Sequence, residues 1–226
     1  MRSLGLGARE SGHDSEGRLV TWYERGASSV GVHDSLRDAL LLNELFADEE
    51  LTPDEKAELL PRMVLADPDG EARRLGDDLW PMLSDVLWDA FGIDLDGSRA
   101  SAREEPVFDW DEDAGRIRSA MRAVYGVDID AQAGSMSYST ACDLLGGALQ
   151  SGDNAMRTAV YYRTAKPPAR TRHNGDAVDA FEAARSHYRL RGRGARPEDD
   201  MAAQNAAMGD SFASARRAAR AVAPRG

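Results

Sequence analysis

The segment from Val32 to Leu65 constrains the fold more than any other part of the chain, because it encodes two consecutive helices. Asp34 stands at a position suited to a helix N-cap, and the apolar residues after it recur at helical spacing, namely Leu36, Leu40, Leu41 and Leu45. Thr52 precedes Pro53 and is followed three residues on by Glu55, the pattern of a capping box with proline in the first turn. The segment therefore predicts a helical hairpin over about 35–47 and 53–65.

The rest of the chain is also predicted to be mainly helical. Residues 18–24 and 29–32 are β-prone and are separated by turn residues, which favours a small hairpin. A turn is predicted at 67–70. A further helix is expected over about 71–91, with a kink or break near Leu79 and Trp80 caused by Pro81. Others are expected from Asp109 or Asp111 to Gly126, from Ser135 or Ser137, from Asp153, and over about 175–190. The predicted fold class is mainly α: a compact multi-helix bundle with a small N-terminal β-hairpin and a C-terminal helical extension.

Composition divides the chain into four parts. Residues 1–17 are rich in Gly, Ser and charge and predict a disordered tail, residues 18–190 form the helical domain, and residues 191–200 read as a linker. Residues 201–226 predict an amphipathic helix whose seam residues alternate in steps of four and three. Such a helix is suited to docking on another polypeptide, so the candidate partner-binding residues are Met201, Asn205, Met208, Phe212, Ala215, Ala219 and Val222.

The net charge of −11 is distributed unevenly along the chain. Residues 34–113 carry 24 acidic and 7 basic side chains, whereas residues 114–226 carry 11 acidic and 17 basic ones. The acidic half argues against a nucleic-acid-binding surface there. The asymmetry either steers partners, including other copies of the chain, or serves solubility alone.

Localisation follows from what the sequence lacks. It contains no apolar run long enough for a membrane helix and no N-terminal apolar run of the kind a secretory signal needs. Cys142 is the only cysteine, so no internal disulfide is expected. A cytoplasmic protein that contacts no membrane is the simplest interpretation.

The strongest candidate for a metal site fails on its spacing. Asp109, Asp111 and Asp113 imitate the start of a calcium-binding loop, but Ala114 and Ala120 stand where that loop needs glycine and glutamate. None of the four histidines pairs with another at metal-ligand spacing, and no glycine-rich phosphate loop occurs. We therefore predict no catalytic residues, no cofactor and no metal, and hence no enzyme.

Three segments resemble the bacteriophage gp-fifteen-like family, and together they span roughly residues 30 to 190. They are Val32–Phe46 with the following Leu51–Pro61, Val107–Ile129, and the short run Val160-Tyr-Tyr-Arg163. The Phe-Asp-Trp-Asp-Glu-Asp-Ala stretch within the second is the most specific. Tyr138 is the only aromatic residue where the family usually has paired tryptophans.

The resemblance implies a tail assembly chaperone of long-tailed phages or prophages. Such proteins are regarded as coating the tape measure protein and giving way as subunits of the major tail protein polymerise around it, and self-association is expected. Two alternatives remain open: a minor structural virion protein of the tail or connector, and a helical adaptor unrelated to phage.

Overall fold

The computed structural model describes residues 10–25, 28–95, 97, 99 and 107–190. The predicted linker 191–200 and C-terminal helix 201–226 lie outside the described residues. The same holds for residues 1–9 and for every candidate partner-binding residue: Met201, Asn205, Met208, Phe212, Ala215, Ala219 and Val222.

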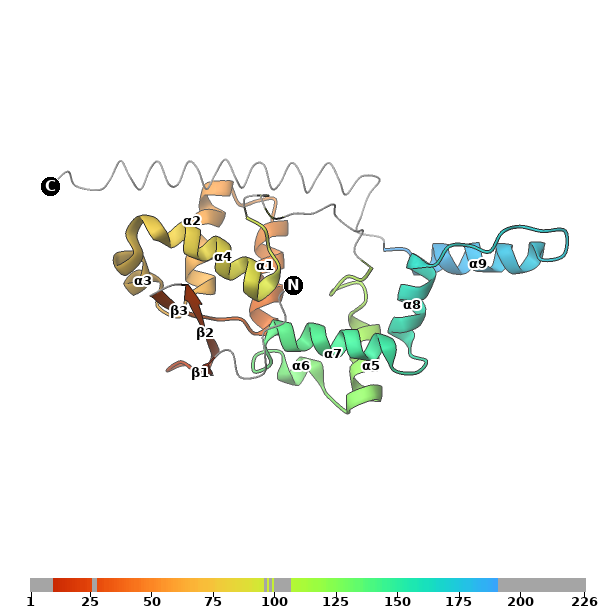
Figure 1. Cartoon of the computed structure of the whole chain (residues 1–226), viewed down its shortest axis with the longest axis horizontal. Helices are drawn as coiled ribbons and strands as arrows, with labels where there is room; N and C mark the ends of the chain where they lie inside the picture. The colour runs from red at the N-terminus through yellow and green to blue at the C-terminus, as the bar shows by residue number, and fades with distance from the viewer. Residues whose placement is uncertain (1–9, 26–27, 96, 98, 100–106, 191–226) are drawn as a thin grey trace. The chain divides into compact units, whose positions relative to one another are not determined.

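The chain contains two compact units (Figure 1). Among the described residues, unit 1 comprises those up to 99 together with 133–141, and unit 2 comprises 107–132 and 142–190. The boundary falls within one helix, because residues 138–141 of α7 belong to unit 1 and its remainder belongs to unit 2.

Unit 1 opens with an antiparallel sheet in the order β1-β2-β3, formed by Ser11–His13, Leu19–Arg25 and Ser28–Val32. The predicted hairpin is β2 with β3, and β1 adds a third strand within the segment predicted to be disordered. The outer edge of β3 is covered by the end of α2. There the His33 backbone N–H donates to the Val64 carbonyl at 2.8 Å, and the Ala66 N–H donates to the Gly31 carbonyl at 2.9 Å.

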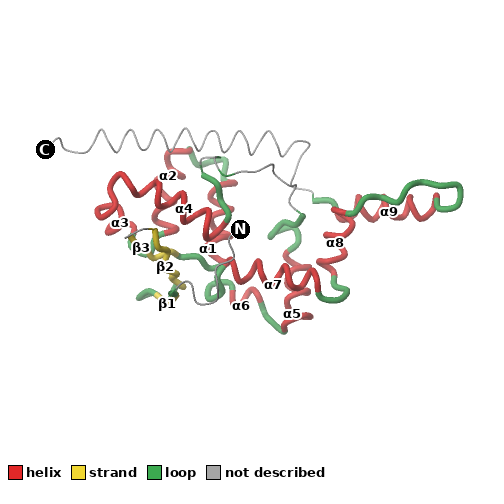
Figure 2. The backbone as a smooth tube through the Cα atoms, in the orientation of Figure 1, coloured by secondary structure: helices red, strands yellow, loops and turns green. Residues whose placement is uncertain are grey.

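The helices of unit 1 follow the sheet (Figure 2) and are α1 Leu36–Ala47, α2 Pro53–Val64, α3 Pro68–Leu75, a 3₁₀ turn Gly76–Asp78 and α4 Leu79–Phe91. The predicted α1–α2 hairpin is confirmed, as is its capping box. The Thr52 hydroxyl accepts from the Glu55 N–H, and the Glu55 carboxylate accepts from the Thr52 N–H. Apolar faces of the sheet and of these helices form one core, which includes Val30, Val32, Leu42, Leu60, Leu65, Leu83 and Leu87.

Of two predictions for the middle of unit 1, one is wrong and one is confirmed. Residues 67–70 begin a helix instead of forming an isolated turn, because the Asp67 carboxylate accepts from the Gly70 N–H at 2.9 Å and caps α3. The kink or break expected near Leu79 and Trp80 is confirmed: the 3₁₀ turn Gly76–Asp78 interrupts the helix directly before α4 begins at Leu79, and Gly76 has φ of +53°, which suits glycine. Pro81 lies in the first turn of α4, where a backbone N–H has no intrahelical partner to lose.

The predicted cap of α1 shifts by one residue. Ser35 is the N-cap, and its hydroxyl accepts from the Asp38 N–H at 3.2 Å. Asp34 is buried instead, and its two carboxylate oxygens accept from the Thr21 hydroxyl at 2.8 Å and the Tyr23 hydroxyl at 3.0 Å. Asp34 therefore joins the start of α1 to β2, a contact that local sequence patterns do not reveal.

Unit 2 contains α5 Ala114–Tyr125, α6 Ile129–Gln132, most of α7 Tyr138–Gln150, α8 Ala155–Thr164 and α9 Gly175–Tyr188. Helix α8 packs against both α5 and α9. Gly126 ends α5 as predicted, with φ of +67°. The N-cap of α8 is Asn154 rather than Asp153, because the Asn154 side chain accepts from the Arg157 N–H at 2.9 Å.

None of the described helices has both the length and the apolar character needed to cross a membrane.

We predict that Tyr23→Phe lowers the free energy of unfolding by about 1–3 kcal/mol, because it leaves the buried Asp34 carboxylate short of one donor. Urea unfolding of the full chain measures the loss. Tyr125→Phe is the matched control, since it removes the same atom from a ring that is 38% exposed. Equal losses in the two variants would show that the Tyr23–Asp34 hydrogen bond contributes no more to the free energy of unfolding than an exposed tyrosine hydroxyl does.

Candidate functional site

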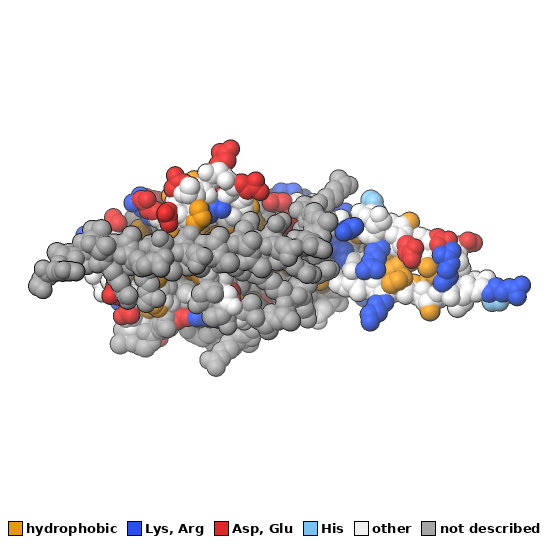
Figure 3. Space-filling view, turned by 90° about the horizontal axis from the view of Figure 1, so that it is seen from above, with side chains coloured by type: hydrophobic (Ala, Val, Ile, Leu, Met, Phe, Trp, Pro, Cys, Tyr) orange, Lys and Arg blue, Asp and Glu red, His pale blue; other side chains and the backbone are white. Residues whose placement is uncertain are grey.

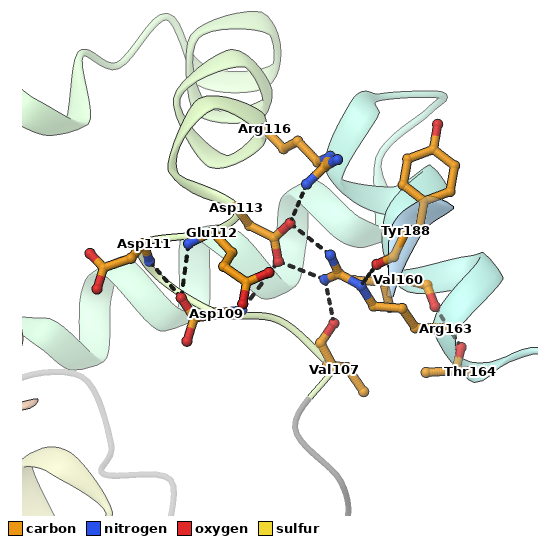
Figure 4. Close-up of polar contacts among 10 residues, drawn as sticks. All are labelled: Val107, Asp109, Asp111, Glu112, Asp113, Arg116, Val160, Arg163, Thr164 and Tyr188. Atoms are coloured by element: carbon orange, nitrogen blue, oxygen red, sulfur yellow. Dashed lines mark hydrogen bonds and ion pairs between the residues drawn. The ribbon is translucent and has the colours of Figure 1, made fainter. Parts of the chain in front are cut away.

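The second and third family-like segments meet at one place in unit 2 (Figure 4). Arg163 projects from α8, while Asp113 immediately precedes α5 and Val107 lies at the start of the same stretch. Tyr188 ends α9 and contributes its backbone carbonyl. We call these four residues, with Arg116 of α5, the Arg163 cluster.

The guanidinium of Arg163 forms a two-point ion pair with Asp113. Its Nη1 lies 2.6 Å from Asp113 Oδ2 and its Nη2 lies 2.9 Å from Asp113 Oδ1. The remaining donors reach backbone carbonyls: Nη1 also donates to Val107 at 3.0 Å, and Nε donates to Tyr188 at 2.5 Å. One side chain thereby links α8 to the approach to α5 and to the end of α9, using the planar fork that only arginine offers.

Both carboxylate oxygens of Asp113 accept further hydrogen bonds. Arg116 Nη1 donates to its Oδ1 at 2.7 Å, and the Asp109 backbone N–H donates to its Oδ2 at 3.1 Å. The Asp113 side chain is 0% exposed and that of Arg163 is 9% exposed. A charge this deeply buried is tolerated only when it is paired and hydrogen-bonded, and this pair meets both conditions.

These contacts set the protonation of Asp113. Burial by itself would raise the pKa of the Asp113 carboxyl, but hydrogen bonds from Arg163, from the Asp109 backbone N–H and from Arg116 outweigh it. The pKa of Asp113 is therefore below its usual value, and the carboxylate is ionised at neutral pH.

The run that imitates a calcium loop has a different role in the structure. Asp109 Oδ1 accepts from the backbone N–H groups of Asp111 and Glu112 at 2.8 and 2.9 Å, which closes a turn before α5. The predicted cap of α5 at Asp109 or Asp111 is therefore wrong, since the helix begins after Asp113. Among the described residues, no group of three or more His, Cys, Asp or Glu side chains is placed to hold a metal ion.

Aromatic rings continue the Arg163 cluster along α8 and α9. The rings of Tyr162 and Tyr188 stack with centroids 5.5 Å apart, and Phe181 lies 5.3 Å from Tyr162. The Arg116 guanidinium lies over the Tyr188 ring at 5.4 Å. At the outer end of this set, Tyr161 contacts Phe181 and keeps 55% of its surface exposed.

The sequence prediction did not include the Arg163 cluster among functional residues. In the sequence, Arg163 belongs to one family-like segment and Asp113 to another, where it is also part of an acidic run, and nothing in either segment indicates that the two side chains meet. The chemistry available to the cluster is that of a cross-link, because the donors of Arg163 and both oxygens of Asp113 already engage protein partners. We therefore interpret it as the element that holds α5, α8 and α9 in position.

A family model described as Bacteriophage Gp15 protein matches residues 18–190. The match covers described parts of both units and includes the whole Arg163 cluster. No curated protein and no solved structure matches the chain.

We predict that Asp113→Ala lowers the free energy of unfolding by about 3–5 kcal/mol, because it leaves the buried guanidinium of Arg163 without its counter-charge. Denaturant unfolding measures this loss. The matched control is Asp153→Ala, which removes a fully exposed carboxylate 3.8 Å from Arg157 and should cost less than about 1 kcal/mol. A small loss at Asp113 would contradict the assigned role.

The lowered pKa of Asp113 also predicts a pH dependence. Its stabilising contribution is complete above the pKa of an unfolded aspartate, about 3.9, and is lost as the pH falls toward the lower folded pKa. The difference in unfolding free energy between the parent protein and Asp113→Asn should therefore shrink below about pH 4. Unfolding curves recorded from pH 6 downward test this, and a constant difference would show that Asp113 titrates normally.

Proposed function

Since the chain belongs to the bacteriophage Gp15 family, we propose that it is a tail assembly chaperone. In this proposal it binds the tape measure protein, keeps it soluble, and assists recruitment of major tail protein subunits around it. The protein acts in the host cytoplasm during assembly and performs no chemical reaction.

The observation that carries this proposal is the role of the family-like segments in the structure. The capping box of α2 and the Arg163–Asp113 pair both come from these segments; the first fixes a helix start and the second joins α8 to the start of α5. A protein whose characteristic residues build a scaffold is suited to work through the surfaces that the scaffold presents.

The described surface has properties that suit a chaperone. Unit 1 is rich in exposed carboxylates, which favours solubility while an apolar client is bound. Large apolar side chains are nevertheless exposed in both units: Trp22, Leu41 and Leu59 in unit 1, and Tyr125 and Tyr161 in unit 2. Apolar side chains of this kind are what the apolar face of a helical client would contact.

The C-terminal residues provide a second contact in this proposal. Methionine adapts to varied partners, and Met201 and Met208 belong to the predicted seam of residues 201–226. We expect this segment to strengthen client binding, with the described surface still able to bind without it.

Co-expression with the tape measure protein of the same phage tests the proposal. We predict that the tape measure protein becomes soluble and co-purifies with the chaperone, and that deletion of residues 192–226 reduces the recovered amount. A tape measure protein that remains insoluble, or that never co-purifies, would overturn the proposal. Full recovery with the deleted chain would overturn only the role of the C-terminal segment.

A minor virion protein of the tail or connector is the competing function for a member of a bacteriophage family. Mass spectrometry of purified particles separates the two, because an assembly chaperone should be absent from mature virions. Stoichiometric amounts of this chain in the particle would favour the virion protein.

A further inference from the structure

Helix α9 is exposed to an unusual degree for a helix of its length. Of its fourteen residues only Val178 is buried. Its main contact is with α8, through Phe181 and Tyr188. Helices of this length are marginal in water and normally gain their stability by packing an apolar face. The outer face of α9 is therefore a surface without a partner among the described residues.

The cations near this surface lie mainly in the loop before α9, because α9 itself carries Asp176, Asp179 and Glu182 against Arg185. We define the α8–α9 arm as residues 155–190, and it carries seven basic and three acidic side chains. The guanidinium of Arg163 is already paired with Asp113 inside the Arg163 cluster, and Arg170 forms an ion pair with Asp179 at 2.9 Å. The exposed cations that make no ion pair with described residues are Lys166, Arg172, Arg185 and Arg189. Figure 3 shows basic side chains spread along this part of the molecule, with acidic and hydrophobic side chains among them.

The opposite charge is concentrated between α1 and α2. We define the acidic turn as residues 44–58, which carry seven acidic side chains and one basic one. All seven carboxylates are exposed. The single cation, Lys56, donates to the Phe46 carbonyl at 2.9 Å, so its ammonium group is engaged within the hairpin.

We propose that the α8–α9 arm of one copy docks onto the acidic turn of a second copy. The two surfaces have complementary charge, and each has an apolar anchor nearby: Tyr161 is 55% exposed on the arm, and Leu59 is 37% exposed just after the acidic turn. Every copy carries both surfaces, so the contact is heterologous and can extend to further copies.

A second copy fits the arm better than a mainly apolar client does. The exposed part of α9 consists chiefly of charged and alanine side chains, and Tyr161 on α8 is the large apolar side chain exposed in the described arm. The loop before α9 carries Lys166, Arg170 and Arg172 and no acidic residue, so the arm gains most there from a partner with many carboxylates. The strength of the contact should fall with ionic strength, because exposed charges are screened over about 10 Å at 0.1 M salt.

Sedimentation velocity of the purified full chain, without any client, tests the proposal. We expect the parent protein to form dimers and larger species at ~50 mM salt and to return toward monomer at ~500 mM. Two charge-reversed variants change only loop residues, which limits the risk of misfolding: Lys166→Glu with Arg172→Glu on the arm, and Glu49→Arg with Glu50→Arg on the acidic turn. Each variant alone should remain monomeric at low salt, and an equimolar mixture of the two should associate again.

The control is Arg118→Glu with Arg122→Glu, the same charge change on α5, where the side chains are 53% and 70% exposed. It should associate like the parent protein. A parent protein that is monomeric at both salt concentrations, or a mixture that stays monomeric, would overturn the proposal. Because no tape measure protein is present, either failure would leave the proposed chaperone function untouched.

Discussion

The arrangement of unit 2 depends on Arg163. Its partners lie 50 residues away at Asp113, 56 away at Val107 and 25 away at Tyr188, so one guanidinium closes three long loops of the chain. Because both charges are buried, breaking the pair would leave each charge without a partner, which is costly. The two-point geometry of the pair further restricts how the helices can be arranged. The exposed aromatic and basic surface of α8 and α9 is positioned by this interaction.

Sequence predicted the features that depend on neighbours within four residues. The Thr52 capping box was recognised because its donors and acceptors are adjacent in the chain, and the stop at Gly126 because glycine alone suits its positive φ. Where two neighbouring residues could both act as the N-cap of a helix, tertiary contacts determine which of them does. Ser35 and not Asp34 caps α1, because buried hydroxyl groups of β2 donate hydrogen bonds to the Asp34 carboxylate. The same limit explains why the Arg163 cluster escaped prediction, since nothing local to Asp113 indicates a partner 50 residues later.

In the proposed function the protein works through its surfaces. The matched region includes the residues that fix helix positions, and the exposed charges are divided between an acidic turn in unit 1 and a basic arm in unit 2. A chaperone that holds a long client needs several copies along it, and contacts between copies that are weak enough to be displaced. Exposed, screened charge pairs around a small apolar anchor provide contacts of that strength.

Hydrogen exchange of the Arg163→Lys variant tests the central claim most directly. Lysine keeps the charge, but its single nitrogen has three N–H groups and cannot replace the four hydrogen bonds that Arg163 makes from three nitrogens. The account predicts faster amide exchange in α5, α8 and α9, with α1 to α4 of unit 1 exchanging as in the parent protein. Unchanged exchange in α8 and α9, or an equal acceleration across both units, would contradict the claim that Arg163 is what holds unit 2 together.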